Sequence, residues 1–347
     1  MDQDRRRFLM SATKALALGT VAGSTGFWKV LSQAPLPLKY RIDIHHHYGP
    51  PSWVAAMKGN PLLQPANTTW TPEKSIEAMD HGGAAAAVLS ITNPGVYIGD
   101  KIQASRLARE CNDFGAKVLQ AHPTRFGLFA SLPLPDVDAA LKEIEYAYDQ
   151  IDADGIALMT SYDDTWLGNA AYRPVMAELN RRNAVVFVHP TAANCCRGLN
   201  YAPGIRPASI EYGTDTTRAI TGVCFSGDAV RYPNIRWIWS HGGGTIPFLA
   251  GRIAGAVASF KQQLPLGLMP ELKKFYYDLA GAANGGVVAS LRQLVGPEKI
   301  MFGTDFPPGG GILESSQAIR ALNMFSETEL KLVERDNAVG LLPRLKT

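Results

Sequence analysis

The segment Arg41–Tyr48, with the sequence RIDIHHHY, holds three of the seven histidines in this 347-residue chain. Its apolar and β-branched character predicts a buried β-strand. Alternate residues of a strand point to the same face, so the side chains of His45 and His47 would lie together and that of His46 would point away. Imidazoles buried without partners are costly, so this triplet indicates a site where the rings bind something.

Seven further segments have the same character, and helical patterns separate them. The eight predicted strands are Ile42–His47, Ala84–Ile91, Gly127–Leu132, Gly155–Thr160, Val185–His189, Ile235–His241, Phe275–Leu279 and Ile300–Thr304. The predicted helices include Pro72–Asp80, Lys101–Leu119, Val137–Gln150, Ala171–Arg182, Asp215–Ser226, Gly251–Gln263, Val287–Val295, Ser315–Met324 and Glu327–Val339. Near-continuous apolar strands that alternate with helices form a parallel sheet covered by helices.

Eight such units over this length predict an α/β fold, a single (β/α)8 TIM barrel of the metal-dependent hydrolase type. The chain shows no linker, internal repeat or low-complexity segment after residue 36, so we expect one catalytic domain at residues 36–347.

The composition is that of a soluble globular protein, with 46% hydrophobic and 19% charged residues and a formal net charge of +3. Residues 1–34 hold five basic and two acidic residues, which accounts for the whole net charge. The remainder is close to neutral, so nothing indicates a nucleic-acid partner.

The basic cluster lies in the segment Asp4–Met10, which resembles a twin-arginine export signal. The apolar segment that follows, Ala12–Trp28, is too short and too glycine-rich to predict a membrane span. We therefore expect residues 1–34 to be an export signal that directs the protein to the periplasm. The alternative is a disordered basic tail on a protein that stays in the cytoplasm.

Catalytic groups of such barrels lie at the carboxyl ends of the strands. The predicted strand ends carry His45 and His47, then His189, then His241, and finally Asp305. Three imidazoles and one carboxylate, from His45, His47, His189 and Asp305, form a ligand set that suits Zn²⁺ and can also hold Mn²⁺ or Fe²⁺. Strand Gly155–Thr160 ends without a Lys, Glu or His that could bridge a second ion, so we expect one metal ion.

His241 precedes three glycines, Gly242–Gly244, which let the backbone approach a ligand closely. A histidine beside a metal without binding it is a natural general acid or base; the alternative is a fourth histidine ligand. Asp305 could bind the metal and also carry a proton. We expect the following Phe306–Pro308 segment to desolvate this carboxylate and raise its pKa.

Four motifs in this order resemble the metal-dependent decarboxylase branch of the amidohydrolase superfamily, whose founding member is aminocarboxymuconate-semialdehyde decarboxylase. The motifs are Ile42–His47, Val188–Pro190, His241–Gly244 and Gly303–Pro307. The resemblance covers roughly residues 40–340. It implies that His45, His47, His189 and Asp305 bind the metal and that His241 is the catalytic base or holds the substrate.

The family pattern continues to an arginine, which Arg252 matches here. The resemblance implies that Arg252 binds a substrate carboxylate in a neighbouring subunit, and therefore that the protein is a homodimer. The founding member has a further arginine before its second strand, but Trp70–Asp80 contains none, and Lys74 lacks the bidentate fork. A monocarboxylic aromatic substrate therefore fits better than a dicarboxylate. The segments His45–Pro51 and Leu89–Gly95 resemble the 6-methylsalicylate decarboxylase subgroup.

These observations predict non-oxidative decarboxylation of a small aromatic acid like an ortho-hydroxybenzoate. A protonated Asp305 would deliver the proton to the ring carbon, and the metal with His241 would stabilise the charge on oxygen. One alternative is a mononuclear-metal hydrolase of a lactone or amide, in which the metal and His241 activate water. A third is an exported metal-binding protein without catalysis.

Overall fold

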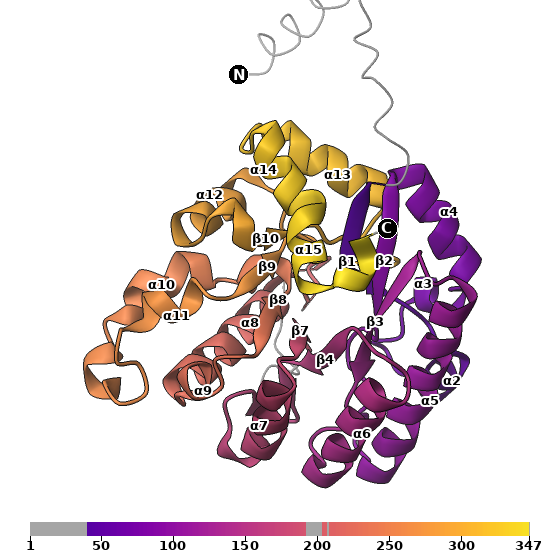
Figure 1. The fold of residues 1–347 in the computed structure, drawn as a ribbon, viewed down its shortest axis with the longest axis horizontal. Helices are drawn as coiled ribbons and strands as arrows, with labels where there is room; N and C mark the ends of the chain where they lie inside the picture. The colour runs from indigo at the N-terminus through magenta and orange to yellow at the C-terminus, as the bar shows by residue number, and fades with distance from the viewer. Residues whose placement is uncertain (1–39, 192–202, 207, 347) are drawn as a thin grey trace, which may run out of the picture. The chain divides into compact units, whose positions relative to one another are not determined.

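The computed structural model describes residues 40–191, 203–206 and 208–346; the predicted export signal at residues 1–34 lies outside them. All eight predicted strands are present, joined by helices that lie outside them (Figure 1). They are β1 (Arg41–His47), β2 (Ala84–Ser90), β3 (Phe126–Ser131), β4 (Gly155–Met159), β7 (Val185–His189), β8 (Arg236–Trp239), β9 (Tyr276–Asp278) and β10 (Ile300–Met301). They pair in parallel, each with the next, in one eight-stranded sheet. A short antiparallel pair, β5 (Ser161–Tyr162) and β6 (Thr165–Trp166), follows β4.

Backbone hydrogen bonds between β1 and the segment that follows β10 join the two edges of this sheet. The Ile44 N–H donates to the Phe302 carbonyl at 3.2 Å, and the His47 N–H donates to the Phe306 carbonyl at 2.7 Å. Between them, the Asp305 N–H donates to the His45 carbonyl at 2.9 Å. The sheet is therefore a barrel, as predicted, and its closure places Asp305 beside the histidine triplet.

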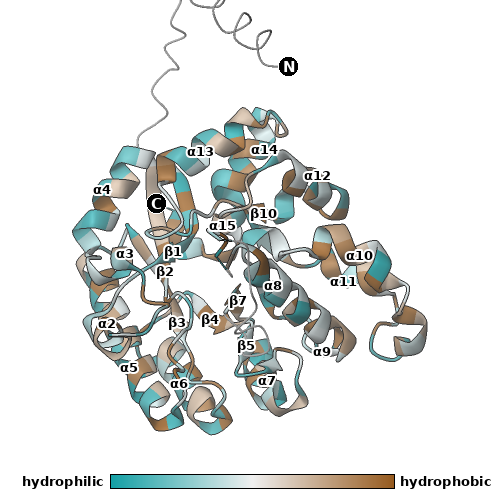
Figure 2. Ribbon diagram, turned by 180° about the vertical axis from the view of Figure 1, so that it is seen from behind, coloured by the Kyte–Doolittle hydropathy of each residue, from teal (hydrophilic) through white to brown (hydrophobic). Residues whose placement is uncertain are grey.

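The helices match most of the predicted ones and carry apolar and polar residues along their length, as amphipathic helices do (Figure 2). They are α2 (Pro51–Ala56), α3 (Pro65–Thr68), α4 (Pro72–Gly82), α5 (Lys101–Ala121), α6 (Val137–Asp149), α7 (Arg173–Arg181), α8 (Ala208–Phe225), α9 (Asp228–Arg231), α10 (Ile246–Ala254), α11 (Leu268–Leu272), α12 (Gly285–Leu294), α13 (Ile312–Ala321), α14 (Glu327–Lys331) and α15 (Asn337–Leu341). Aspartate side chains cap the long helices α5 and α6, where Asp100 and Asp136 accept backbone N–H groups. No helix in the described ranges is long and apolar enough to span a membrane.

Two predicted helices are wrong in their bounds: Gly251–Gln263, and Asp215–Ser226, whose helix α8 begins at Ala208. The helix α10 begins at Ile246, with Pro247 in its first turn, where the fixed φ of proline favours helix initiation. It ends at Ala254, and a short 3₁₀ turn at Val257–Phe260 follows. The residues around Gly255 are mostly exposed, so they bury little apolar surface that could stabilise a longer helix.

The interior of the barrel is apolar, and aromatic rings fill its centre. Phe129 and Phe187 are fully buried, and their rings stack with centroids 5.5 Å apart. The ring of Phe187 also contacts the imidazole of His45 edge-on, with centroids 5.0 Å apart. The barrel core therefore supports β1 directly beneath the histidines.

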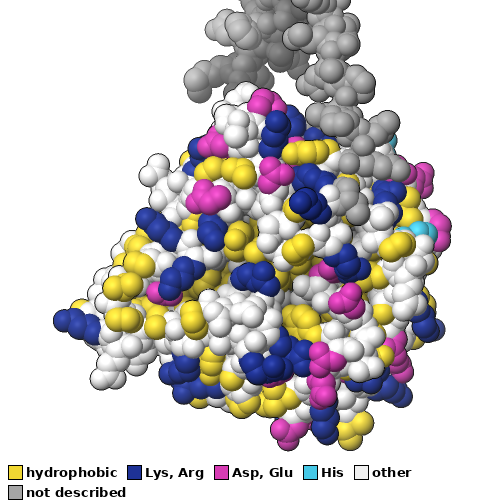
Figure 3. Space-filling model, in the orientation of Figure 1, with side chains coloured by type: hydrophobic (Ala, Val, Ile, Leu, Met, Phe, Trp, Pro, Cys, Tyr) yellow, Lys and Arg dark blue, Asp and Glu magenta, His cyan; other side chains and the backbone are white. Residues whose placement is uncertain are grey.

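The outer surface carries basic side chains interspersed with acidic and apolar ones on the face shown in Figure 3.

Substitution Phe187→Ala should lower the free energy of unfolding by about 3–5 kcal/mol, because it removes a fully buried ring and leaves a cavity. Urea unfolding, followed by circular dichroism, measures this change. The control Ile102→Ala removes an apolar side chain that is 84% exposed on α5, and its effect should be within about 0.5 kcal/mol. Equal effects of the two substitutions would contradict the assigned core.

Candidate metal centre and substrate cavity

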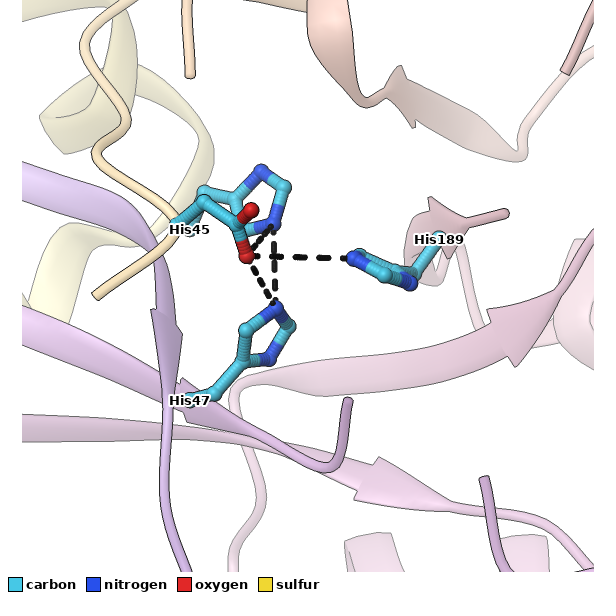
Figure 4. A group of neighbouring side chains, drawn as sticks. His45, His47 and His189 are labelled. Atoms are coloured by element: carbon cyan, nitrogen blue, oxygen red, sulfur yellow. Dashed lines mark hydrogen bonds and ion pairs between the residues drawn. The ribbon is translucent and has the colours of Figure 1, made fainter. Parts of the chain in front are cut away.

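Four of the predicted site residues converge at the carboxyl end of the barrel. His45 and His47 lie at the end of β1, His189 ends β7, and Asp305 follows β10. One ligand atom from each of the four lies within 4.8 Å of the others. Figure 4 shows the three imidazole rings pointing toward one shared region, where dashed lines join their nitrogens to a carboxylate.

The hydrogen-bond partners of His47 and His189 fix which ring nitrogen carries the proton. His47 Nδ1 lies 3.2 Å from the Ser90 carbonyl oxygen, and His189 Nδ1 lies 2.8 Å from that of Pro190. A carbonyl oxygen can only accept, so each of these contacts is a hydrogen bond when the proton lies on Nδ1, and Nε2 then presents a lone pair. Both Nε2 atoms face the shared region.

His45 is held in the same way by a carboxylate. Its Nδ1 donates to Asp278 Oδ2 at 2.9 Å, and its Nε2 faces Asp305 Oδ1 at 3.4 Å and His47 Nε2 at 3.1 Å. A carboxylate partner on Nδ1 is a common device for orienting a histidine that binds a metal through its other nitrogen.

The shared region therefore holds several nitrogen and oxygen lone pairs that face one another, with too few hydrogens for each facing pair of atoms to form a hydrogen bond. His47 Nε2 lies 2.9 Å from Asp305 Oδ1, and the buried Nε2 of His189 has no hydrogen-bond partner among the described residues. Such an arrangement is unfavourable unless a cation lies among the donors. Two nitrogens bound tetrahedrally to one zinc ion lie about 3.3 Å apart, close to the separation seen here. The four residues fit one divalent transition metal ion.

Burial and the two carboxylates set the charges in this group. Burial lowers the pKa of His45, but the carboxylates of Asp278 and Asp305 outweigh it and raise that pKa to about 10. Burial also lowers the pKa of His47. Burial lowers the pKa of His189 as well, and the charges of the neighbouring histidines lower it further, to well below its usual value. A proton on His45 and a metal ion are therefore two ways of supplying the positive charge that this site requires.

The expected rise in the pKa of Asp305 is wrong in this structure. Burial does raise the pKa of this carboxyl, but the imidazoles of His241, His45 and His47 beside it outweigh burial and hold it well below its usual range. The prediction considered the residues that follow Asp305 in the sequence and left out the histidines that surround it in space.

Two further aspartates belong to the site, although the sequence analysis did not identify them. Asp278 Oδ1 accepts the backbone N–H of His241 at 3.0 Å while Oδ2 holds His45, so one side chain joins two predicted functional residues. Asp278 ends β9, so the rule that strand ends carry functional groups could have found it. The other is Asp43, which accepts the Thr304 hydroxyl at 2.6 Å and the Thr304 N–H at 3.1 Å.

His46 points away from the metal group, as the alternation along β1 predicted. Its Nδ1 lies 3.0 Å from Asp43 Oδ2 and its Nε2 lies 2.9 Å from the Ser75 hydroxyl. Its ring stacks on Phe306, with centroids 4.6 Å apart. The histidine triplet therefore supplies two inward rings and one ring that packs β1 against its surroundings.

His241 lies beside the four-residue group, in a tight turn after β8. Its Nε2 is 3.7 Å from Asp305 Oδ2, and its buried Nδ1 has no hydrogen-bond partner in the described part of the chain. The φ of His241 is +54°, a strained value for a residue with a Cβ, and the next three glycines are also left-handed. A Cβ on Gly244 would lie 2.2 Å from the Gly213 carbonyl oxygen, so only glycine fits there.

A cavity of about 670 Å³ opens above the group, and His189, His241 and Asp305 are among the residues that line it. This volume is within the range of small-molecule sites. Its other walls come from the loop after β2, the start of α8, and the segments around Leu62, Gly281 and Pro308.

Two further expectations concern the end of β4 and the position of Arg252. Strand β4 ends at Met159, and the hydroxyl of the next residue, Thr160, bonds to Asp215 rather than entering the metal group. Arg252 is exposed on α10 and does not line the cavity of its own chain. Its predicted role requires a second subunit and stays a prediction.

Comparison with known proteins now places this geometry in a family. The family model described as amidohydrolase matches residues 42–344. The chain belongs to the amidohydrolase family. This amidohydrolase is 38% identical over 332 residues to Decarboxylase yanB of Aspergillus niger, covering 88% of each chain. It is 36% identical to 6-methylsalicylic acid decarboxylase of Penicillium expansum, covering 88% of this chain and 97% of that one.

The fold of this amidohydrolase is shared with solved structures. One is a dihydroxybenzoic acid decarboxylase from a Polaromonas species with bound manganese and the inhibitor 2-nitroresorcinol. The TM-score is 0.72 at 21% identity, over 88% of this chain and 97% of that one. The predicted barrel, the amidohydrolase resemblance and its decarboxylase branch are confirmed.

The purified metal-loaded protein should contain about one divalent transition metal ion per chain, and the His45→Ala/His47→Ala variant should contain none. Elemental analysis measures both, with the exposed His81→Ala substitution as a control that keeps its metal.

In Asp278→Asn, the amide cannot accept from the His45 ring and from the His241 N–H with the same geometry. Metal affinity should therefore fall about 10- to 100-fold, measured by competition with a chelator.

The exposed Asp138→Asn substitution on α6 is the matched control for this second variant. Two ions per chain in the wild-type protein, or an unchanged metal affinity in Asp278→Asn, would contradict this description of the site.

Proposed function

We propose that this protein is a metal-dependent decarboxylase of a small aromatic acid like an ortho-hydroxybenzoate, with one divalent ion held by His45, His47, His189 and Asp305. One observation carries the proposal: three lone-pair nitrogens and an ionised carboxylate meet at a cavity, and His241 lies 3.7 Å from the second oxygen of that carboxylate. The relatives named above, which are decarboxylases, support the same reaction class.

The ligand set favours zinc as the resident ion. Three imidazoles and one carboxylate suit Zn²⁺, and Mn²⁺ is the alternative because it also accepts such ligands. When bound, the ion supplies positive charge for the substrate oxygens. A carboxylate group and a neighbouring ring hydroxyl are both negative or polar oxygens, so a substrate that carries the two side by side suits the site.

The reaction exchanges a carboxylate for a hydrogen, so the protein must deliver one proton to the ring carbon. Asp305 directs Oδ1 toward the histidine ligands and Oδ2 toward His241. A proton can pass from His241 Nε2 to this oxygen and from there to the carbon.

The protonated ring then loses its carboxylate. The bond between the ring carbon and the carboxylate carbon breaks, its electron pair returns to the ring, and neutral CO₂ leaves. No oxidant, reductant or organic cofactor enters this balance. His241 takes up a proton from solvent before the next cycle.

We also propose that the protein is an exported homodimer. Arg252 and Phe248 are four residues apart on α10, so they lie on one face, and Phe248 is 81% exposed. An exposed aromatic ring beside an arginine is typical of a contact surface. Export rests on the signal-like segment Asp4–Met10 alone, and fractionation of cells that express the full chain tests it.

Substitution His241→Gln should lower kcat about 10²- to 10⁴-fold, because the proton can no longer pass through this side chain. Metal content should stay unchanged, since His241 is not a ligand. The assay measures CO₂ and the phenolic product from 2-hydroxybenzoates that vary at the ring positions. Acid release from a lactone without CO₂ release from any aromatic acid would support the hydrolase reading instead.

Substitution Arg252→Gln should raise KM for the acid substrate about tenfold if the side chain binds the carboxylate from the neighbouring subunit. Sedimentation analysis should show a dimer for the wild-type protein. A fully active monomer, or an unchanged KM in the variant, would remove Arg252 from the site. The exposed Arg106→Gln substitution on α5 is the matched control.

A further inference from the structure

The wall of the cavity formed around the start of α8 carries a positive charge. Among the described residues that line the cavity, Arg206 is the one lysine or arginine, and no ion pair joins it to a carboxylate in the described part of the chain. Tyr212, near the start of α8, lines the same cavity. An anionic substrate that enters this cavity therefore meets an arginine of its own subunit.

Tyr212 adds a hydrogen-bond donor on the same wall, close to the metal group. Its ring meets the imidazole of His189 edge-on, with centroids 6.2 Å apart. Its hydroxyl oxygen accepts a hydrogen bond from Asn93 Nδ2 at 2.6 Å. A phenol has an ordinary pKa of about 10, so its hydroxyl keeps the proton at neutral pH. No acceptor for that proton occurs among the described residues.

Two hydrogen bonds in series hold this hydroxyl in position. The Thr191 hydroxyl donates to Asn93 Oδ1 at 2.6 Å, which orients the amide so that its Nδ2 points at Tyr212. Thr191 follows His189 by two residues, and its backbone N–H donates to the Thr160 hydroxyl at 3.2 Å. The Tyr212 hydroxyl is therefore held in register with the strand end that carries a metal ligand.

The geometry points to Tyr212 and Arg206 as residues that bind the substrate carboxylate within the same subunit, with Asn93 as the positioning residue of Tyr212. This inference rests on the proposed function, since it assigns a second side of the same site. A metal ion held by the four ligands would supply positive charge for one carboxylate oxygen and the ring hydroxyl. The second carboxylate oxygen has lone pairs for the phenol donor and the guanidinium, as well as for Arg252 of a neighbouring subunit.

The charge on the carboxylate disappears as CO₂ forms, and this fixes the kinetic signature of these contacts. Hydrogen bonds to a carboxylate form when the substrate binds and do not strengthen in the transition state. Interactions of that kind lower KM and do not raise kcat. The loss of Tyr212 or Arg206 should therefore appear in KM, in contrast to the loss of His241.

The test compares two unreactive probes by calorimetry on the metal-loaded full chain. Benzoate has the carboxylate but lacks the ring hydroxyl, and phenol lacks the carboxylate. Arg206→Gln and Tyr212→Phe should each weaken benzoate binding about tenfold and change phenol binding less than about twofold. Arg206→Lys should restore part of the benzoate affinity, because it keeps the charge without the fork. In steady-state decarboxylation, KM should rise by the same factor while kcat stays within about twofold.

The matched controls are Arg106→Gln and Tyr97→Phe, neither of which lines the cavity. Equal losses for benzoate and phenol, unchanged benzoate binding in both variants, or no benzoate binding by the wild-type protein would each overturn the inference. A selective loss of benzoate binding in a protein that releases no CO₂ would uphold the inference and reject the proposed function. Normal decarboxylation with unaltered benzoate binding in the variants would do the reverse.

Discussion

The hydrogen bond from the Asp305 N–H to the His45 carbonyl is the contact on which the site depends. It belongs to the set that closes the barrel between β1 and the segment after β10. Asp43 reinforces this closure by accepting both the hydroxyl and the N–H of Thr304. Without this seam, the carboxylate would not lie beside the histidines of β1, so one backbone arrangement both completes the fold and assembles the metal group.

The geometry of the centre is set by groups that do not line the cavity. Ser90, Pro190 and Asp278 each accept from the Nδ1 of one ring, and in this way they turn three lone pairs toward the same region. Lone pairs that face one another without a hydrogen between them repel, and the stability of the rest of the fold offsets this repulsion. Such a site favours a bound cation, because with neutral imidazoles its hydrogens cannot give every facing nitrogen and oxygen a hydrogen-bond partner.

Much of the site could be predicted from sequence because residues at the carboxyl ends of the strands of a barrel lie together on one side of it. The rule placed His45, His47, His189 and Asp305 together, although they come from three different strands. It could not supply the electrostatic environment of Asp305, since the histidines that lower its pKa are remote in sequence. It also missed the early start of α10, because helix ends depend on packing that residue patterns describe poorly.

Asp278 has a consequence for how this enzyme can diversify. One of its oxygens holds a metal-binding ring, and the other holds the backbone of the residue that we propose carries the proton. A larger or smaller ion that displaced His45 would also displace His241, so metal choice and acid–base chemistry are mechanically coupled. The wall at the start of α8 is tied to the floor as well, because Tyr212 accepts a hydrogen bond from Asn93 and its ring meets that of His189. A new substrate that required a change at Tyr212 would therefore also disturb a metal-binding ring, so metal choice and substrate choice are coupled in this barrel.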